Sequence, residues 1–421
     1  MEISDLLIAL LAIFAAAKLF GELAERIGQP AVLGEMIGGI VVGVSGLHLV
    51  DAHSAVLHVL AELGVLLLLF LIGLETDLDR LLSVGGASVA VAVTGVVLPF
   101  AAGFGVGRWL NYPTTLSIFL GAALTATSVG ITARVLSDLG HLKSDESQVI
   151  LGAAVIDDIL GLVLLTVVTA MAAGERITAL GTAKIFGLAF GFVALAVVIG
   201  SFLAPRLIDF ITRLRVRKAL FFASLMFAFS MAYLADRAGS ALIIGAFAAG
   251  LVLARTDHGR EIEHEIYDVA QFFIPIFFVS VGAAVDLKAI NPFNAETRPF
   301  FIVGMALTVV AIIGKLLAGY AAFGRPLRKF VIGVGMVPRG EVGLIFAQLG
   351  LTAGLLSAGL YSSVAMMVMI TTFLAPPALR TLLGKTRQPA DDTDSALADV
   401  VTETMQDDDD RRQAERRRTE T

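Results

Sequence analysis

Two adjacent carboxylates lie in the middle of an apolar stretch of the sequence. Asp157 and Asp158 occur within AAVIDDILG, residues 153–161, where every other side chain is apolar or absent. A charged group inside a hydrocarbon layer is costly, so acids in such stretches are functional candidates by default. Successive helical residues project about 100° apart. We therefore expect one carboxylate to face a water-filled cavity and the other to face a neighbouring helix.

A single lysine lies in a later apolar stretch and predicts a charge partner for this pair. Lys315 occupies the middle of IIGKLLA, residues 312–318, far from any polar segment. A buried ammonium group requires a carboxylate nearby. Either Asp157 or Asp158 is the natural candidate.

This chemistry favours ion binding over bond cleavage. Desolvation penalises the bare anion, so a buried aspartate binds either a proton or a small cation. Competition for one site gives obligatory exchange if the site is reached alternately from each side of a membrane. Hard oxygen ligands from Asp158, Thr127, Ser128 and freed backbone carbonyls suit sodium or lithium. An intramembrane aspartyl protease is disfavoured because it needs its two aspartates on different helices.

Two apolar stretches contain residues that interrupt helices. Thr125-Ala-Thr-Ser128 lies midway through one stretch, and its hydroxyls can satisfy freed backbone groups. Val337-Pro-Arg-Gly340 lies within another, where Pro338 lacks an amide proton and Gly340 is a weak helix former. We expect both helices to be broken. Arg339 and Glu341 flank the second break and are assigned to its structure or gating, with Glu341 as an alternative lining of the cation path.

The composition places these residues in a membrane protein. Of 421 residues, 57% are hydrophobic and 16% charged, with a mean hydropathy of +0.85, whereas soluble domains carry about 25% charged residues. Apolar runs long enough to cross about 30 Å of hydrocarbon recur along the chain. The first run follows Glu2 and Asp5 and lacks a basic leader, so we expect a retained helix. The expected fold is an all-α integral membrane protein.

Division at the polar breaks predicts thirteen transmembrane helices and a polar tail. The tail, residues 386–421, cannot bury a core and is expected to be disordered. The expected spans are 3–20, 31–47, 57–74, 86–107, 114–137, 148–172, 180–205, 218–235, 239–254, 269–285, 299–322, 328–352 and 357–382.

Positive charges in the loops orient the chain, because cytoplasmic loops carry an excess of lysine and arginine. An odd number of spans places the termini on opposite sides. With the N-terminus outside and the C-terminus in the cytoplasm, the outer loops hold Arg108, Arg176, Arg237, Lys288 and Arg298. The inner loops then hold Arg26, Arg80, Lys143, Arg213, Arg215, Arg217, Lys218, Arg255, Arg260, Arg325, Arg328, Lys329 and Lys385.

An internal repeat indicates two copies of opposite orientation. Gly34-Glu-Met-Ile-Gly-Gly39 resembles Gly245-Ala-Phe-Ala-Ala-Gly250, and Gly73-x-x-x-Asp77-Leu78 resembles Gly282-x-x-x-Asp286-Leu287, at nearly one offset. Partner spans are seven apart, so the second to sixth and ninth to thirteenth spans cross in opposite directions. Inverted repeats with broken helices are typical of secondary transporters.

Other function classes find little support in the sequence. Cysteine is absent, which excludes thiolate catalysis and Cys-ligated metals. No basic patch with aromatic residues predicts nucleic-acid binding, and no phosphate-binding G-x-x-x-x-G-K-[ST] motif is present. The segment His258-x-x-Glu261-x-x-His264 has metal-compatible spacing but is assigned to a solvated loop. We expect no enzyme activity, no cofactor and no bound metal.

Two motifs resemble the NapA-type sodium/proton antiporters, in the second branch of the bacterial monovalent cation:proton antiporters. They are GAALTATSVGITAR, residues 121–134, and LGAAVIDDILG, residues 151–161, and the likeness extends to about residue 385. The resemblance implies that Asp158 is the main cation ligand and that Asp157 pairs with Lys315. The adjacent aspartates with a lysine are the pattern of the electrogenic members.

The resemblance also implies a domain arrangement in which two broken helices cross within a core domain. A homodimer would form through residues of about 1–80 and 218–290, with a linker helix at about 180–205. A core of about 86–172 and 299–382 would move in an elevator-like shift. The expected function is electrogenic exchange of sodium or lithium for protons in the inner (plasma) membrane. The alternatives are potassium/proton exchange on the same site and a cation sensor without transport.

Overall fold

The computed structural model describes most of the chain. The described residues are 3–51, 54–172, 218–238, 241–288, 292–324, 326–340 and 355–384, with scattered positions between 187 and 211 and between 343 and 351. Regular structure in these residues is entirely helical, which confirms the all-α expectation. Met1–Gly384 form one compact unit. The predicted tail and most of the predicted span at 180–205 lie outside the described residues.

One group of described helices combines the beginning of the chain with its middle. In this first group, α3 packs against α11 and α12, α2 against α1 and α12, and α10 against α11. The first group comprises α1 (Ile3–Arg26), α2 (Ala31–Val42), α3 (Ala55–Glu75), α10 (Ala219–Arg237), α11 (Leu242–Leu253) and α12 (Gly259–Ala283).

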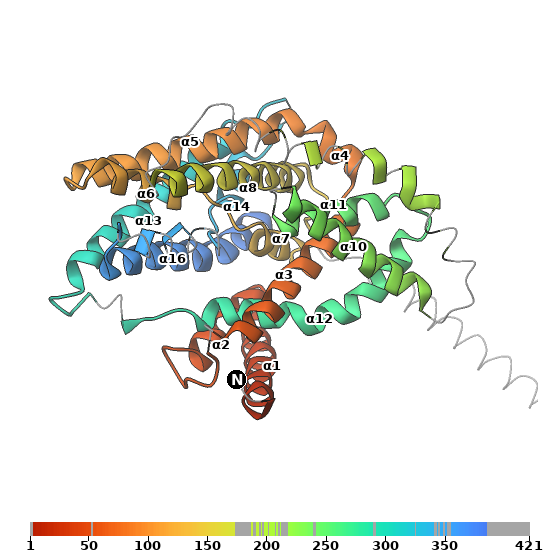
Figure 1. The fold of residues 1–421 in the computed structure, drawn as a ribbon, viewed down its shortest axis with the longest axis horizontal. Helices are drawn as coiled ribbons and strands as arrows, with labels where there is room; N and C mark the ends of the chain where they lie inside the picture. The colour runs from red at the N-terminus through yellow and green to blue at the C-terminus, as the bar shows by residue number, and fades with distance from the viewer. Residues whose placement is uncertain are drawn as a thin grey trace, which may run out of the picture. The chain divides into compact units, whose positions relative to one another are not determined.

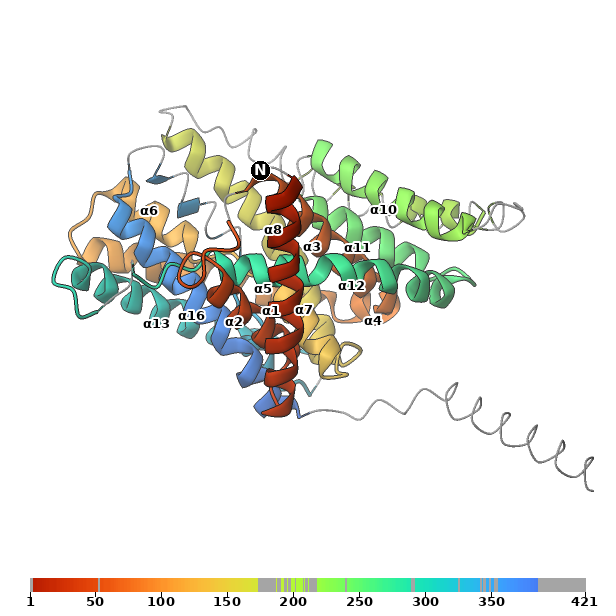
Figure 2. The ribbon, with the colours of Figure 1, turned by 90° about the horizontal axis from the view of Figure 1, so that it is seen from below.

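A second group combines the remaining long helices. Figures 1 and 2 show α5, α6, α13 and α16 side by side, and α8 packs against α5. A short helix, α4 (Leu78–Ser83), joins the groups, and α7 (Val129–Asp138) contacts both of them. The second group comprises α5 (Gly85–Trp109), α6 (Thr114–Ala123), α8 (Asp145–Ala172), α13 (Arg298–Gly319), α14 (Lys329–Gly335) and α16 (Ala358–Leu383).

Close glycine contacts occur in pairs that the sequence repeat exchanges. Gly39 of α2 packs against Gly282 of α12, and Gly73 of α3 packs against Gly250 of α11. A Cβ on either Gly39 or Gly73 would lie only 2.9 Å from the Cα atom of its partner. In the repeat register Gly39 corresponds to Gly250 and Gly73 to Gly282. The contact between α2 and α12 is therefore equivalent to the contact between α11 and α3, with the two copies of the repeat in exchanged roles.

The same register extends to α1 and α10, which the sequence comparison did not include. A Cβ on Gly34 would lie 2.0 Å from the carbonyl oxygen of Phe20, and one on Gly245 would lie 2.3 Å from that of Met231. Both glycines therefore let a short helix approach the backbone of the helix before it. This places α1–α2 and α10–α11 in equivalent positions of the repeat.

Several helix boundaries differ from the prediction, and two of the differences have a clear physical cause. The helix expected from residue 269 begins at Gly259, and His258-x-x-Glu261-x-x-His264 forms its N-terminal boundary and first turns rather than a solvated loop. Ile262, Ile266 and Ala270 are buried along one face of this segment while charged residues occupy the other, so the average hydropathy hides the helix. The helix expected to reach residue 47 ends at Val42, where the amide of Val44 turns to donate to the carbonyl oxygen of Ala283.

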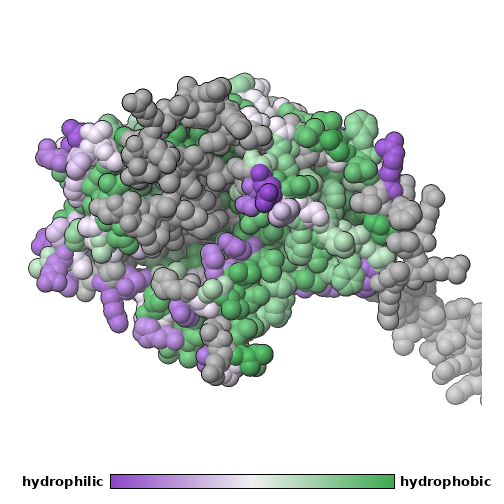
Figure 3. All heavy atoms as spheres, viewed as in Figure 1, coloured by the Kyte–Doolittle hydropathy of each residue, from purple (hydrophilic) through white to green (hydrophobic). Residues whose placement is uncertain are grey.

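The described surface is suited to lipid. Hydrophobic residues cover much of the face in Figure 3, with hydrophilic residues gathered in a few groups, mainly near its edges. Exposed large side chains include those of Leu7, Leu11, Phe222, Met226 and Tyr233 on α1 and α10. Among the described residues, seven helices are long and apolar enough to cross a membrane. The total of thirteen spans stays a prediction.

Candidate functional site

The helix predicted to break near Thr125 is interrupted between α6 and α7. Residues 124–128 are not helical, and the hydroxyl of Thr125 donates to the carbonyl oxygen of Ala122 at 2.8 Å. Thr125 therefore adds a side-chain bond to a carbonyl at the end of its own helix half, which also accepts from the Thr125 amide. The amide of Ser128 and the hydroxyl of Thr127 bond elsewhere.

The second interruption follows α14, at residues 336–340. Pro338 lies in this segment and has no amide proton to continue a helix. The helix half beyond the break is only partly described, and Glu341 lies outside the described residues.

The two interruptions cross and bond to each other. The Ser128 amide donates to the carbonyl oxygen of Pro338 at 2.9 Å, and the Thr127 hydroxyl donates to that of Met336 at 3.4 Å. The Thr132 hydroxyl donates to the carbonyl oxygen of Gly335 at 2.7 Å. Each break thus satisfies backbone groups that the other break leaves free, which is the condition for irregular backbone at membrane depth.

Arg339 holds this crossing together and adds a positive charge to it. The side chain is fully buried, and its Nη1 donates to the carbonyl oxygen of Ala126 at 2.5 Å. The backbone carbonyl of Arg339 accepts a short hydrogen bond from the hydroxyl of Thr372 on α16. Its Nε and Nη2 have no hydrogen-bond partner within the described residues, and its charge interacts with that of Asp157. Arg339 therefore both links the two breaks by a hydrogen bond and supplies a positive charge near Asp157.

The carboxylate pair lies on α8 and is buried. Asp157 is 1% exposed and Asp158 is 8% exposed. Lys315 of α13 is fully buried, and its Nζ lies 3.1 Å from Oδ2 of Asp157. Lys315 also interacts electrostatically with Asp158 and Arg339. Of the two partners that the sequence allowed for Lys315, the structure places Asp157 in contact.

Glycines make room for the lysine between α5 and α13. A Cβ on Gly95 of α5 would lie 3.3 Å from Nζ of Lys315, and one on Gly314 would lie 3.0 Å from the ring of Pro99. Larger residues at either position would push the two helices apart or displace the ammonium group. Gly95 and Gly314 therefore position Lys315 against Asp157.

Several residues of this arrangement were not identified from the sequence. Thr132, Thr372 and Gly95 act on partners that are far away along the chain. Thr132 follows Ser128 by about one helical turn, so its hydroxyl was the detectable signal once the break was assigned. Gly95 and Thr372 have no such signal, because only the packing of α5 and α16 shows their partners.

The His, Asp and Glu side chains of the described residues form no metal-binding cluster, because no group of three or more of them could hold a metal ion. His258 contacts Glu261 instead, with Nδ1 2.9 Å from Oε2. The site offers two buried carboxylates that interact with two buried positive charges, Lys315 and Arg339, a set that can hold protons or a small cation.

Thr132→Val tests the bond between the two breaks. This change keeps the side-chain shape but leaves the Gly335 carbonyl without the hydroxyl donor, so we expect the free energy of unfolding to fall by about 1–3 kcal/mol. Thr308→Val is the control, because the Thr308 hydroxyl donates only to Gly304 in its own helix, at 2.7 Å. Thermal unfolding in detergent measures both. Equal losses of unfolding free energy in the two variants would show that the bond between the breaks stabilises the protein no more than a hydroxyl bond within one helix.

Comparisons with known proteins agree on one family. A family model described as "Sodium/hydrogen exchanger, transmembrane" matches residues 7–385. The chain is 40% identical over 413 residues to the high-affinity Na⁺/H⁺ antiporter NhaS3 of Synechocystis sp., covering 90% of each. It is 38% identical over 381 residues to the Na⁺/H⁺-K⁺ antiporter GerN of Bacillus cereus, covering 88% of this chain and 95% of that protein.

A solved structure shares the fold at lower identity. The sodium proton antiporter MjNhaP1 of Methanocaldococcus jannaschii superposes with a TM-score of 0.72 at 17% identity. The match covers 91% of this chain and 97% of that one. At this identity the likeness supports the architecture alone.

Proposed function

Because the chain belongs to the sodium/hydrogen exchanger family of transmembrane antiporters, we propose that it exchanges sodium or lithium for protons at the Asp157–Asp158 pair. The observation that carries the proposal is the buried ion pair between Lys315 and Asp157 beside two crossed helix breaks. The exchange activities named for the relatives from Synechocystis and Bacillus cereus support it.

In this mechanism Asp158 binds the cation, and Asp157 forms an ion pair with Lys315. A bare carboxylate at Asp158 is unfavourable in this interior, so the site holds either a proton or a cation with Thr127, Ser128 and nearby carbonyls as further oxygen ligands. When Asp157 takes up a proton, its ion pair with Lys315 breaks. Two protonatable carboxylates for one sodium ion make the exchange electrogenic.

The two helix groups supply the moving parts of the proposal. The first group, within about 1–80 and 218–290, would form a homodimer in the lipid, and the second group, within about 86–172 and 299–382, would carry the ion site. A shift of the second group against the first would expose the site alternately to each side. We place the protein in the inner (plasma) membrane, with the N-terminus outside and the tail in the cytoplasm.

Flux in proteoliposomes tests the exchange. With an imposed pH gradient, addition of sodium or lithium is expected to alkalinise the vesicle interior and give a voltage signal. Asp158→Asn is expected to reduce the pH change and the voltage signal to the level of empty vesicles. The neutral amide can neither take up a proton nor balance the charge of a bound cation. Asp236→Asn is the control, since Asp236 is exposed on α10. Full sodium-driven flux in Asp158→Asn would contradict the proposal.

A second candidate is potassium/proton exchange on the same site, which the name of the Bacillus cereus relative favours. A response to potassium without a voltage signal would move the protein to that function. Absence of flux with every cation, together with retained cation binding, would favour a sensor.

A further inference from the structure

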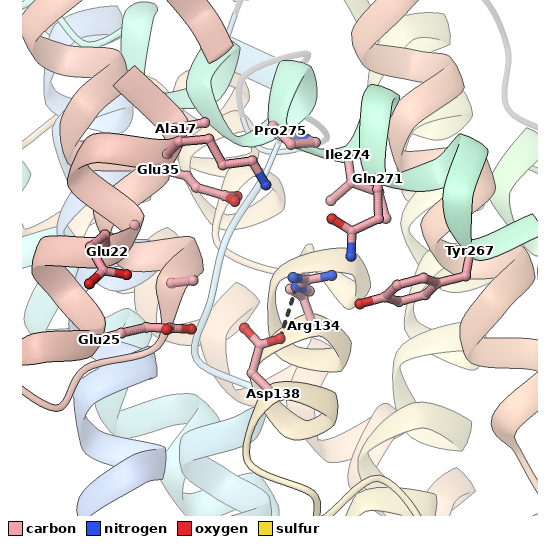
Figure 4. Close-up of a pocket in the computed structure, with 13 residues that line it drawn as sticks. Ala17, Glu22, Glu25, Glu35, Arg134, Asp138, Tyr267, Gln271, Ile274 and Pro275 are labelled. Atoms are coloured by element: carbon pink, nitrogen blue, oxygen red, sulfur yellow. Dashed lines mark ion pairs between the residues drawn. The ribbon is translucent and has the colours of Figure 1, made fainter. Parts of the chain in front are cut away.

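A charged cavity lies between α7 and the first helix group, apart from the aspartate pair (Figure 4). It has a volume of about 360 Å³ and is lined by residues of α1, α2, α7 and α12. Neither Asp157 nor Asp158 lines it. Its chemistry therefore needs an explanation of its own.

Acidic side chains outnumber basic ones in the cavity wall. Glu22, Glu25, Glu35 and Asp138 line it against Lys18 and Arg134, an excess of two negative charges. Some of these charges are matched, because Arg134 Nε lies 3.0 Å from Asp138 Oδ1, and Glu22 pairs with Arg26 at 2.9 Å on the surface.

These pairs leave over Glu25, which is exposed, and Glu35, which is buried. Glu35 is 7% exposed, and its Oε2 is buried without a hydrogen-bond partner in the described residues. No ion pair within 4 Å joins it to a described lysine or arginine, although Lys18 and Arg134 act on it at longer range. Figure 4 shows its carboxylate at the α2 wall of the cavity. Tyr267 and Gln271 of α12 line another wall of the same cavity.

The space beside Glu35 fits a cation with part of its water shell. A buried carboxylate is unfavourable unless a counter-charge or donor neutralises it. A water molecule occupies about 30 Å³ of liquid, so the cavity has room for an ion and several waters. The carboxylate of Glu35 and the amide oxygen of Gln271 are hard ligands, whereas the hydroxyl of Tyr267 points toward Arg134. Although four acids line the cavity, no described group of three or more could hold a metal ion together, which favours a monovalent ion over a divalent one.

We propose that this cavity binds a sodium ion at the Glu35 carboxylate, as a second cation site separate from Asp157 and Asp158. This site is separate from the exchange reaction, because sodium can bind at Glu35 without being transported. It lies where α7, which carries Thr132 of the crossed breaks, meets α1, α2 and α12 of the first group. A cation there neutralises part of the negative excess of the cavity wall, between α7 and the first group.

Thermal unfolding of the full chain in detergent tests this site, with sodium chloride compared against choline chloride at equal ionic strength. The double variant Asp157→Asn/Asp158→Asn removes the first site. We expect sodium to raise its Tm by about 2–4 °C at concentrations well above the dissociation constant. Addition of Glu35→Gln is expected to abolish this shift, whereas addition of Glu22→Gln, at the cavity wall but paired with Arg26, is expected to keep it.

The same titration in the otherwise unchanged chain covers the case in which the double variant does not fold. There Glu35→Gln is expected to remove one of two phases of sodium-dependent stabilisation. A sodium-dependent rise in Tm that survives Glu35→Gln would overturn the proposal. So would the absence of any such rise in a folded double variant, or its equal loss on Glu22→Gln. Flux is measured separately, so loss of the exchange function with an intact Glu35-dependent shift is distinguishable from the reverse.

Discussion

Lys315→Met is expected to lower the free energy of unfolding by about 3–5 kcal/mol, because it leaves the Asp157 carboxylate buried without its ion-pair partner. Both side chains are fully buried, with Nζ 3.1 Å from Oδ2. Oδ1 of Asp157 has no hydrogen bond within the described residues to compensate. Only the charge of Arg339, which forms no hydrogen bond to Asp157 within the described residues, then remains to offset the buried carboxylate.

The double variant Asp157→Asn/Lys315→Met is expected to recover most of this loss. Replacement of both members of a buried pair by neutral groups of similar volume is often neutral or stabilising. A double-mutant cycle from thermal or denaturant unfolding in detergent gives the coupling between the two positions.

Lys218→Met is the matched control for this cycle. Lys218 also forms an ion pair, with Glu265 at 2.8 Å, but its side chain is 59% exposed. Pairs of this kind contribute about 0.2–1 kcal/mol. If Lys315→Met were no more destabilising than Lys218→Met, Asp157 would be neutral in the folded protein, and the proposed charge pair would be wrong.

The second large effect is expected from alanine at the paired glycine contacts. In Gly250→Ala the new Cβ would lie 2.2 Å from the carbonyl oxygen of Phe70, and in Gly39→Ala it would lie 2.2 Å from that of Val279. Backbone atoms of a packed helix cannot yield as a flexible side chain can, so α3 and α11, or α2 and α12, must separate. Overpacking of a core typically costs about 1–3 kcal/mol and at times more; we expect values at or above the upper end.

Gly105→Ala separates this packing effect from the general effect of alanine in a helix. Gly105 lies inside α5, and a Cβ there would meet no atom within 4 Å. Alanine is favoured over glycine in a helix by about 0.8–1 kcal/mol, so Gly105→Ala is expected to keep or raise Tm. The yield of monodisperse protein and its Tm measure all three variants. Similar behaviour of Gly39→Ala and Gly105→Ala would mean that the repeat contacts are not close-packed.

Much of the architecture was predictable because each signal was local. Intramembrane charge is rare and costly, so Asp157, Asp158 and Lys315 could be identified from their apolar neighbours alone. The segments at Thr125 and Pro338 carried their own helix-breaking chemistry, and both lie in non-helical backbone. The repeat was visible because glycine is required wherever two backbones approach closely.

Helix lengths were less predictable where burial is one-sided. The first turns of α12 bury Ile262 and Ile266 but expose charged residues, so a hydropathy average does not detect them. In the sequence Glu35 only lies near the start of the predicted span at 31–47. The packing of α1, α7 and α12 around it instead leaves it buried at the wall of a cavity.

By itself, the sequence determined that this protein is helical, that it lies in a membrane, and which charged side chains lie within its apolar segments. These follow from composition, periodicity and the high cost of burying a charge. Only the tertiary structure decided that Lys315 contacts Asp157, that Arg339 bonds to the carbonyl of Ala126, and that Glu35 faces a cavity. The reason is physical: each of these relations joins residues on different helices, and its energy depends on distances that only the packing of those helices sets.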